Sequence, residues 1–155
     1  MTTTPSGTRI TQALSTEHCL RLMSAARAVT LPQGQRLFDE GGRADWFWVV
    51  RTGTVALDMH VPGRRSPVIE VVGSDELVGW SWLFPPHRWQ LGASAASEVR
   101  AYEFDATAVR IMCARDPKLA TDVARWVGRV LARRLQAART RLLDLYAPYG
   151  SGGSW

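Results

Sequence analysis

Cysteine and histidine are the residue types in this chain best suited to nucleophilic or metal chemistry, and there are two of the first and three of the second. Cys19 and Cys113 lie far apart, and neither has a close cysteine or histidine partner in a zinc-ligand pattern. Histidine as a residue type changes charge near physiological pH, so His87, in the run Pro-Pro-His-Arg-Trp, is a candidate for an axial ligand or a proton-dependent switch. Because no second ligand is near it in the sequence, we interpret His87 as a solvated or hydrogen-bonded loop residue. We therefore expect reduced thiols and no metal or haem site.

The residue patterns of covalent catalysis are also missing from the sequence. It contains no Gly-x-Ser-x-Gly motif, no cysteine followed by a suitable histidine partner and no paired carboxylates in a turn-rich context. We therefore assign no catalytic residue and expect a protein that is not an enzyme.

Positive charge gathers in the last third of the chain. Lysine and arginine number 19 against 14 acidic residues, which gives a net charge of +5, and all the basic residues except Lys118 are arginines. This charge has two interpretations: a surface for an anionic partner, such as nucleic acid or an acidic protein, or a solvated helix face whose arginine stems cover apolar surface. We favour the solvated face. The basic residues of this region are Arg110, Arg115, Lys118, Arg125, Arg129, Arg133, Arg134, Arg139 and Arg141.

The length and composition predict one globular domain with a tail at each end. A chain of 155 residues that is 46% hydrophobic is large enough to build a core without disulfides. Residues 1–9 and 147–155 are rich in Thr, Ser, Gly and Pro, so we expect a disordered first tail and a flexible second one, with the role of Trp155 left open. The sequence shows no secretion signal and no run near the roughly 18 apolar residues that would span a membrane. We expect a soluble, cytoplasmic protein that does not bind membranes.

The pattern along the chain predicts a β-rich middle between helices. Ser15 or Thr16 is a suitable N-cap for a helix over residues 15–29, which ends before Pro32. Short β-branched and aromatic runs at 46–50, 54–59, 68–72 and 99–104 alternate with glycine and proline turns, which favours a small antiparallel barrel or sandwich. Residues 105–114 predict a short helix. Asp116 as N-cap and Pro117 as first helical residue then begin a long helix over 117–146.

A seven-residue apolar repeat runs along the long helix, with spacings of 4, 3, 4, 3, 4 and 3 residues. Such a repeat is typical of a seam between two helices, so we expect a homodimer through this face. A second stripe, Val123, Trp126, Val127 and Val130, is expected to pack on the β-rich part. The alternative is that both stripes cover one broad intramolecular face. The predicted dimer interface consists of Ala124, Gly128, Leu131, Leu135, Ala138, Leu142 and Leu145.

The order of elements and turns resembles the cyclic-nucleotide-binding domain of the catabolite-activator and FNR superfamily of bacterial sensors. The resemblance rests on residues 31–41, 44–55, 77–84, 95–105 and 129–146. It implies a mainly β fold with flanking helices: a double-stranded β-helix, or jelly roll, with a short N-terminal helix and a long C-terminal dimerisation helix. The implied domain covers residues 10–146, with the β-roll at about 29–104 and the C-terminal helices at 105–146.

The phosphate-binding cassette departs from the family's pattern. In the family it reads Phe-Gly-Glu followed by Arg-Ala-Ala-Thr or Arg-Ser-Ala, where the Glu takes the ribose 2′-hydroxyl and the Arg takes the cyclic phosphate. Here Gly79 matches, but Trp80 stands at the Glu position, Trp89 at the Arg position and Gly92 at the Thr position, while Arg88 is one residue out of register. The ligand-binding residues that the resemblance implies are Gly79, Trp80, Ser81, Trp82, Arg88, Trp89 and Gln90.

Two interpretations of this cassette follow. A gap in the Pro85-Pro86 loop would let Arg88 reach the phosphate of cAMP or cGMP, with Trp80, Trp82 or Trp89 stacking on the base. Alternatively, the indoles fill their own pocket. We favour loss or change of ordinary cAMP binding and leave another small ligand open.

The resemblance implies a non-catalytic regulatory or sensor module. The alternative is a degenerate, ligand-free domain that acts as a dimeric adaptor of a larger enzyme or assembly, with a protein partner. Transcription factors of this superfamily continue beyond the dimer helix with a helix-turn-helix domain, whereas nine residues follow Tyr146 here. We therefore do not expect DNA binding.

Overall fold

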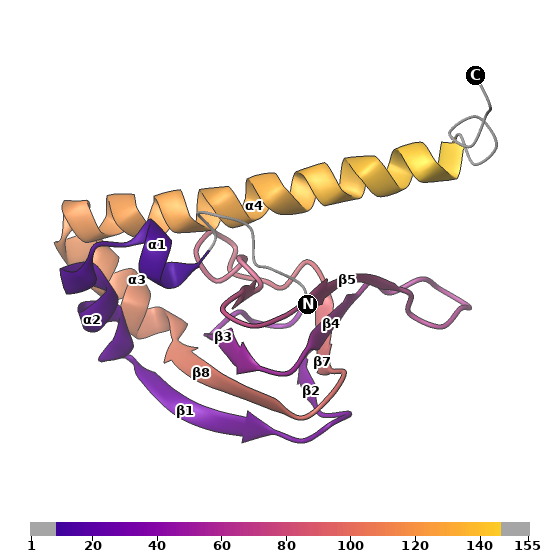
Figure 1. Ribbon diagram of the computed structural model, residues 1–155, viewed down its shortest axis with the longest axis horizontal. Helices are drawn as coiled ribbons and strands as arrows, with labels where there is room; N and C mark the ends of the chain where they lie inside the picture. Colours follow the sequence, from indigo (N-terminus) through magenta and orange to yellow (C-terminus); the bar gives the residue numbers. More distant parts are fainter. Residues whose placement is uncertain (1–8, 147–155) are drawn as a thin grey trace.

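A computed structural model describes residues 9–146, in which short helices, strands and further helices follow one another (Figure 1). The helices are α1 (Ile10–Ala13), α2 (Thr16–Met23), α3 (Ala106–Arg115) and α4 (Pro117–Tyr146). The strands are β1 (Ala26–Leu31), β2 (Arg36–Phe38), β3 (Trp46–Thr52), β4 (Val55–Asp58), β5 (Val68–Val72), β6 (Leu77–Val78), β7 (Gly92–Ala95) and β8 (Val99–Asp105). The predicted tails, residues 1–9 and 147–155, lie outside the described part except for Arg9.

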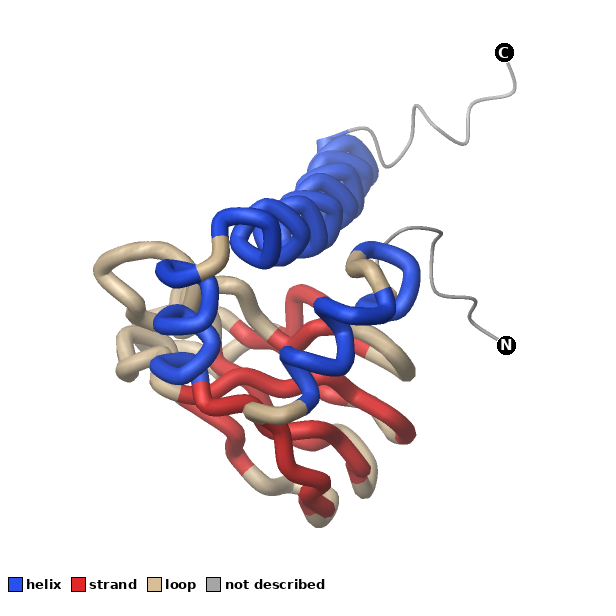
Figure 2. The backbone as a smooth tube through the Cα atoms, turned by 90° about the vertical axis from the view of Figure 1, so that its left-hand side faces the viewer, coloured by secondary structure: helices blue, strands red, loops and turns tan. Residues whose placement is uncertain are grey.

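Within this part, the strands form two antiparallel sheets of four strands, in the orders β1-β8-β3-β6 and β2-β7-β4-β5. Most neighbours in each sheet are distant in sequence, as in a jelly roll, and this confirms the mainly β fold that the sequence indicates. Apolar residues of β3, β4, β7 and β8 are buried, and in β3 the four consecutive residues Phe47–Val50 are all buried, so both faces of this strand are covered. The helices gather on one side of the strands (Figure 2).

The turn between β3 and β4 requires a glycine, Gly53. Gly53 has a φ of +92°, a conformation that residues with a Cβ rarely adopt. A Cβ atom at this position would lie 2.2 Å from the carbonyl oxygen of Glu98. The close approach of the two backbones therefore requires glycine at this turn.

The first predicted helix is too long. Ser15 is the N-cap, since its Oγ accepts a hydrogen bond from the amide of His18 at 3.2 Å, but α2 ends at Met23. Residues Ala26–Leu31 form β1, which pairs along its whole length with β8, from Ala26 opposite Phe104 to Leu31 opposite Val99. This ladder outweighs the helix propensity of the Ala-Arg-Ala run, and the β-roll begins at Ala26 rather than at residue 29.

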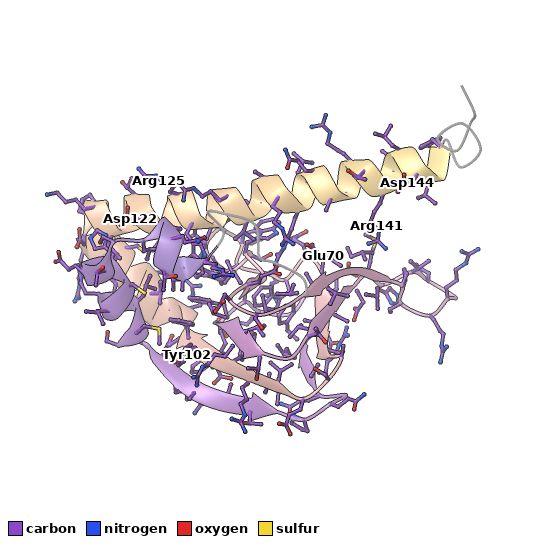
Figure 3. The ribbon with its side chains drawn as sticks, in the orientation of Figure 1. Glu70, Tyr102, Asp122, Arg125, Arg141 and Asp144 are labelled. Carbon is purple, nitrogen blue, oxygen red and sulfur yellow. The ribbon has the colours of Figure 1, made fainter. Side chains whose placement is uncertain are left out.

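The long C-terminal helix begins where the sequence predicts and continues to the last described residue. The Asp116 carboxylate accepts hydrogen bonds from the amides of Lys118 and Leu119 at 3.0 and 3.2 Å, and α4 spans Pro117–Tyr146. The predicted packing stripe, Val123, Trp126, Val127 and Val130, is buried. The second half of α4 runs alongside β5, and Arg141 points from it towards the strands (Figure 3). No helix within residues 9–146 is both long enough and apolar enough to cross a lipid bilayer.

Candidate ligand-binding site

Trp89 is the centre of the cassette. Its side chain is 4% exposed and stacks on Phe38 of β2, with ring centroids 3.8 Å apart and an interplanar angle of 11°. The Phe38 ring also stacks on Trp48 of β3, with 5.8 Å between ring centroids. The Trp89 ring, which the resemblance places at the family's phosphate-arginine position, is therefore uncharged and packed against Phe38 of β2.

Gly79 and Trp89 fit each other closely. Gly79 follows β6 with a φ of +79°, and a Cβ atom there would lie 2.3 Å from Cζ3 of the Trp89 indole. Such a separation is far below van der Waals contact, so the indole occupies the space in front of the Gly79 backbone. The glycine that matches the family's cassette faces a ring of this chain.

The remaining cassette cavity is small. It has a volume of about 130 Å³, whereas sites for small organic ligands usually measure about 300–1,000 Å³. We call it the cassette cavity. It is lined by Phe38, Leu57, Gly79, Trp80, Ser81, Trp89, Gln90, Leu91 and Arg134.

Trp82 and Arg88 lie apart from the other five predicted ligand-binding residues, which all line the cassette cavity. Trp82 is fully buried and stacks on Phe47 of β3 at 3.8 Å between centroids, so it belongs to the core. Arg88 is exposed, and its Nη1 donates a hydrogen bond to the carbonyl oxygen of Gly41 at 3.3 Å. The side chain that one of the two interpretations placed on a phosphate is directed to the neighbouring loop.

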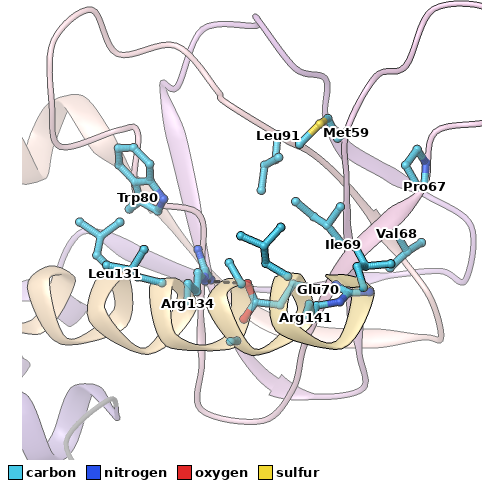
Figure 4. A pocket seen from close by; sticks show the side chains of 15 residues that line it. Met59, Pro67, Val68, Ile69, Glu70, Trp80, Leu91, Leu131, Arg134 and Arg141 are labelled. Carbon is cyan, nitrogen blue, oxygen red and sulfur yellow. Dashed lines mark ion pairs between the residues drawn. The ribbon is translucent and has the colours of Figure 1, made fainter. Parts of the chain in front are cut away.

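A larger cavity, which we call the α4 groove, opens between β5 and α4 (Figure 4). Its volume is about 630 Å³. Trp80, Leu91 and Arg134 line both this groove and the cassette cavity, so the two are neighbours. The residues that line the groove are Met59, Pro67, Val68, Ile69, Glu70, Trp80, Leu91, Leu131, Arg134, Leu135, Ala137, Ala138, Arg141, Leu142 and Leu145.

Arg134 is the most deeply buried of the charged side chains that join α4 to the β-roll in the described residues. Its side chain is 10% exposed, and its Nη2 donates a hydrogen bond to the carbonyl oxygen of Leu77 at 2.5 Å. Its Nε lies 3.4 Å from Oε2 of Glu70, but this buried atom makes no hydrogen bond within the described residues. Burial lowers the pKa of the Arg134 guanidinium, because a charge in a low-dielectric site loses its hydration.

Glu70 faces this guanidinium from β5. Burial raises the pKa of its carboxyl group, while the positive charges of Arg134, Arg133 and Arg141 act in the opposite direction. Beside this pair, Nη1 of Arg133 donates to Oε2 of Glu76 at 2.6 Å. A cluster of partly buried charges therefore joins the middle of α4 to the β-roll.

Sequence reasoning missed Glu70 and Arg134 as members of a site, because Arg134 was grouped with solvated arginines. A signal was present in the heptad. Arg134 and Arg141 follow Leu131 and Ala138 by three residues each, so all four lie on one helix face. An arginine within an apolar stripe was the sign of a buried charge.

A second polar cluster, around Arg36, is internally compensated. Its guanidinium forms a fork with the carboxylate of Asp58, and its Nε donates to Asp39 at 2.7 Å. These hydrogen bonds raise the pKa of Arg36, and its Nη1 also donates to Ser94 at 2.9 Å. The cluster joins β2, β4 and β7, and we interpret it as structural.

The described residues contain no group of three or more His, Cys, Asp or Glu side chains placed to hold a metal ion. Cys19 and Cys113 are free thiols, and burial raises the pKa of both. His87 lies in the loop within the cassette segment, between Trp82 and Arg88, where its amide donates to the carbonyl oxygen of Phe84 at 2.8 Å.

Comparison with known proteins identifies relatives of this fold. The family model for the cyclic nucleotide-binding domain matches residues 28–116. A CRP-like cAMP-activated global transcriptional regulator of Mycobacterium tuberculosis is 29% identical over 124 residues, which cover 80% of this chain and 54% of that protein. The chain thus spans about half the length of the curated relatives that it matches.

Two solved structures have the same fold. The N-terminal domain of a transcriptional regulator from Streptomyces coelicolor superposes with a TM-score of 0.67 at 29% identity, over 81% of this chain and 93% of that one. A cyclic nucleotide-binding domain from Methylobacillus flagellatus gives a TM-score of 0.75 at 21% identity, over 84% of this chain and 74% of that one. Both support the jelly-roll assignment.

Proposed function

This chain belongs to the cyclic nucleotide-binding domain family, and from that premise we propose that it is a dimeric, non-catalytic regulatory module whose cassette no longer accepts cAMP or cGMP. One observation carries this proposal: within the segment where the resemblance implies the phosphate-binding cassette, the Trp89 indole stacks on Phe38 and fills the space in front of the Gly79 backbone.

The chemistry of the cassette supports a closed site. A buried phosphate anion needs a guanidinium or a comparable set of donors, and an indole offers one N–H and no charge. Trp80 likewise offers no acceptor for a ribose hydroxyl at the position of the family's glutamate. A nucleotide would have to displace Trp89 from its stack on Phe38, and the indole itself would supply no countercharge to the phosphate.

Exposed leucines on α4 support a dimer. Leu135, Leu142 and Leu145 belong to the seven-residue repeat and are 59%, 53% and 77% exposed. A second copy of α4 packed along this seam would bury them, because knobs from one helix fill holes in the other. We propose that regulation acts through this helix, whose contacts to the β-roll include the Arg133–Glu76 pair.

We also propose a cytoplasmic location, which the free thiols of Cys19 and Cys113 support, because oxidising compartments favour disulfides. A ligand-free adaptor remains the second candidate function, and the half-exposed Trp46 and Val71 would offer apolar contacts to a protein partner.

Calorimetric titration with cAMP and cGMP tests the closed cassette. The purified protein is expected to give no saturable heat at millimolar nucleotide, while the Mycobacterium tuberculosis cAMP-activated regulator, titrated in parallel, serves as the positive control. Saturable binding of either nucleotide at one site per protomer would contradict the proposal.

A further inference from the structure

We propose that a pocket under α2 binds a free amino acid with an apolar side chain, and that Arg51 and Asp75 bind its carboxylate and its ammonium group. We call this cavity the α2 pocket. The inference goes beyond the proposed function, because the pocket is separate from the cassette and from the face of α4 that is assigned to the dimer.

The α2 pocket lies between the N-terminal helices and the sheet β1-β8-β3-β6 (Figure 1). Cys19 and Met23 of α2 form one wall, while Val49 of β3 and the β8 residues Tyr102 and Phe104 form the floor. None of the described residues that line it lines the cassette cavity or the α4 groove. A ligand here would therefore compete neither with a nucleotide nor with a second copy of α4.

The size of the pocket suits a ligand smaller than a nucleotide. Its volume is about 250 Å³, nearly twice that of the cassette cavity but below the roughly 300–1,000 Å³ of sites for drug-sized ligands. Val49 is 4% exposed and Phe104 is fully buried, so the floor is apolar and removed from water. A branched or thioether side chain of amino-acid size would bury its apolar surface there.

The exposed edge of the pocket carries a positive charge, Arg51, near the end of β3. Its guanidinium carbon lies 5.0 Å from the centroid of the Tyr102 ring. Within residues 9–146, Arg51 forms no ion pair with a carboxylate. A guanidinium without such a partner can bind the carboxylate of a ligand through two N–H groups.

Asp75 supplies the opposite charge from the turn between β5 and β6. Its amide donates to the carbonyl oxygen of Val50 at 2.7 Å, and the Val50 amide donates to the carbonyl oxygen of Glu76 at 3.0 Å. These two bonds hold the turn against the end of β3, where Arg51 follows. Among the described residues Asp75 pairs with Arg9, whose Nε lies 3.9 Å from Oδ2, which is longer than a hydrogen bond. The carboxylate can therefore accept hydrogen bonds from an ammonium group.

One charge of each sign favours a zwitterion. A ligand with a carboxylate alone would bring a like charge to Asp75, and an amine alone would bring one to Arg51. An α-amino acid carries both groups on one carbon atom and adds no net charge. Because Arg51 and Asp75 are exposed, their contacts are screened by solvent and salt, so the apolar side chain is needed as well.

A ligand in the α2 pocket would act on α4 through α2. Two residues of α2 line the pocket, and two others bind the start of α4. Nδ1 of His18 lies 2.5 Å from Oδ2 of Asp122, and Arg21 pairs with Asp116, the residue that caps α4. The same short helix thus contacts both the pocket and the helix of the proposed dimer.

Calorimetric titration of the whole chain with matched probes tests the inference. L-leucine and L-methionine are the amino acids. Isocaproate is leucine without its ammonium group, isopentylamine is leucine without its carboxylate, and glycine is the head group without the apolar body. Leucine or methionine is expected to bind saturably at one site per protomer, and the three fragments at least about fivefold more weakly.

Three variants assign the site. Arg51→Gln removes the guanidinium, Cys19→Phe fills the pocket without a change of charge, and Asp75→Asn removes the carboxylate but keeps a residue type that tolerates the φ of +65°. Each should weaken leucine binding at least about fivefold. Arg100→Gln, at an exposed β8 position outside the pocket lining, is the matched control and should bind as the wild type does. Circular dichroism checks folding, and Arg51→Gln and Asp75→Asn decide should Cys19→Phe unfold.

The Cys19 thiol reports where the ligand lies. In a Cys113→Ser variant Cys19 is the one remaining cysteine of the chain, and saturating leucine should slow its reaction with an aromatic disulfide reagent. Leucine should also slow hydrogen exchange of the backbone amides in α2 and at the start of α4. Unchanged exchange at the start of α4 would contradict the link between the two helices.

The outcomes that overturn the inference are separate from those that test the cassette. Equal affinity for isocaproate and leucine, unchanged binding in Arg51→Gln and Asp75→Asn, an unprotected Cys19, or no binding of either amino acid would each overturn it. These results leave the expected lack of nucleotide binding and the expected dimer as they are. Saturable cAMP binding that leucine does not affect would instead contradict the closed cassette alone.

Discussion

The mutual fit of Gly79 and Trp89 predicts strong energetic coupling between the two positions. Trp89 is 4% exposed, and an aromatic residue of this kind buries about 150–250 Å². At about 25 cal/mol per Å², burial of the ring contributes about 4–6 kcal/mol, of which Trp89→Ala should lose about 4 kcal/mol because alanine keeps part of the contact. For a domain of this size the melting temperature should fall by about 8–16 °C.

The partner substitution is Gly79→Ala, which tests the same contact from the other residue. The methyl group would meet the Trp89 ring at 2.3 Å and would also hold a positive φ, so the ring must move. The positive φ alone costs about 1–2 kcal/mol, and displacement of the indole adds about 1–3 kcal/mol by overpacking. In the Trp89→Ala background the clash is absent, so Gly79→Ala should then cost only about 1–2 kcal/mol.

Urea denaturation of the wild type, both single variants and the double variant measures this coupling as a double-mutant cycle. Trp46→Ala is the matched control, because Trp46 is 43% exposed and should lose less than about 2 kcal/mol. Additive effects at positions 79 and 89, or equal losses for Trp46→Ala and Trp89→Ala, would refute the placement of the indole against the Gly79 backbone.

Three further predictions concern the helices. Leu135→Asp should convert the proposed dimer to a monomer in light scattering, whereas Arg139→Gln should leave it a dimer; a monomeric wild type would contradict the seam. The pKa of Asp122 is lowered by its hydrogen bond with His18, so its contribution to stability should be present above about pH 4 and should be lost as pH falls further. In the Asp122→Asn variant the melting temperature should therefore fall less steeply as pH decreases below about 4. An unchanged pH dependence would exclude this role for Asp122. Glu76→Gln should weaken the ion pair with Arg133 that joins α4 to the β-roll. Hydrogen exchange of the backbone amides in the middle of α4 should then be faster.

Turn chemistry and helix caps made most of the fold predictable. The Asp116 cap with Pro117 as first helical residue gave the start of α4, and the runs between glycine turns correspond to β3, β4, β5 and β8. The strands β1, β2, β6 and β7 fall outside the predicted runs, and the Ala-Arg-Ala start of β1 has no β preference of its own. This segment becomes a strand because β8 lies beside it, and such long-range pairing cannot be derived from local propensity.

The candidate site was only partly predictable. The resemblance placed Gly79 and Trp89 in one cassette, and both line one cavity. Trp80 and Trp82 differ by two positions and are both large and apolar, so the sequence could not show that Trp82 stacks on Phe47 in the core while Trp80 faces the cavities. The role of Arg134 depends on where β5 brings Glu70, which only the packing of α4 on the β-roll determines.

The closed cassette is the central claim, and amide resonances from its own residues test it most directly. In ¹H–¹⁵N spectra of the labelled protein, the Gly79 amide and the Trp89 indole N–H should keep their positions when millimolar cAMP is added. A saturable shift of both resonances would show that the nucleotide enters the space that the indole fills, and would contradict the account.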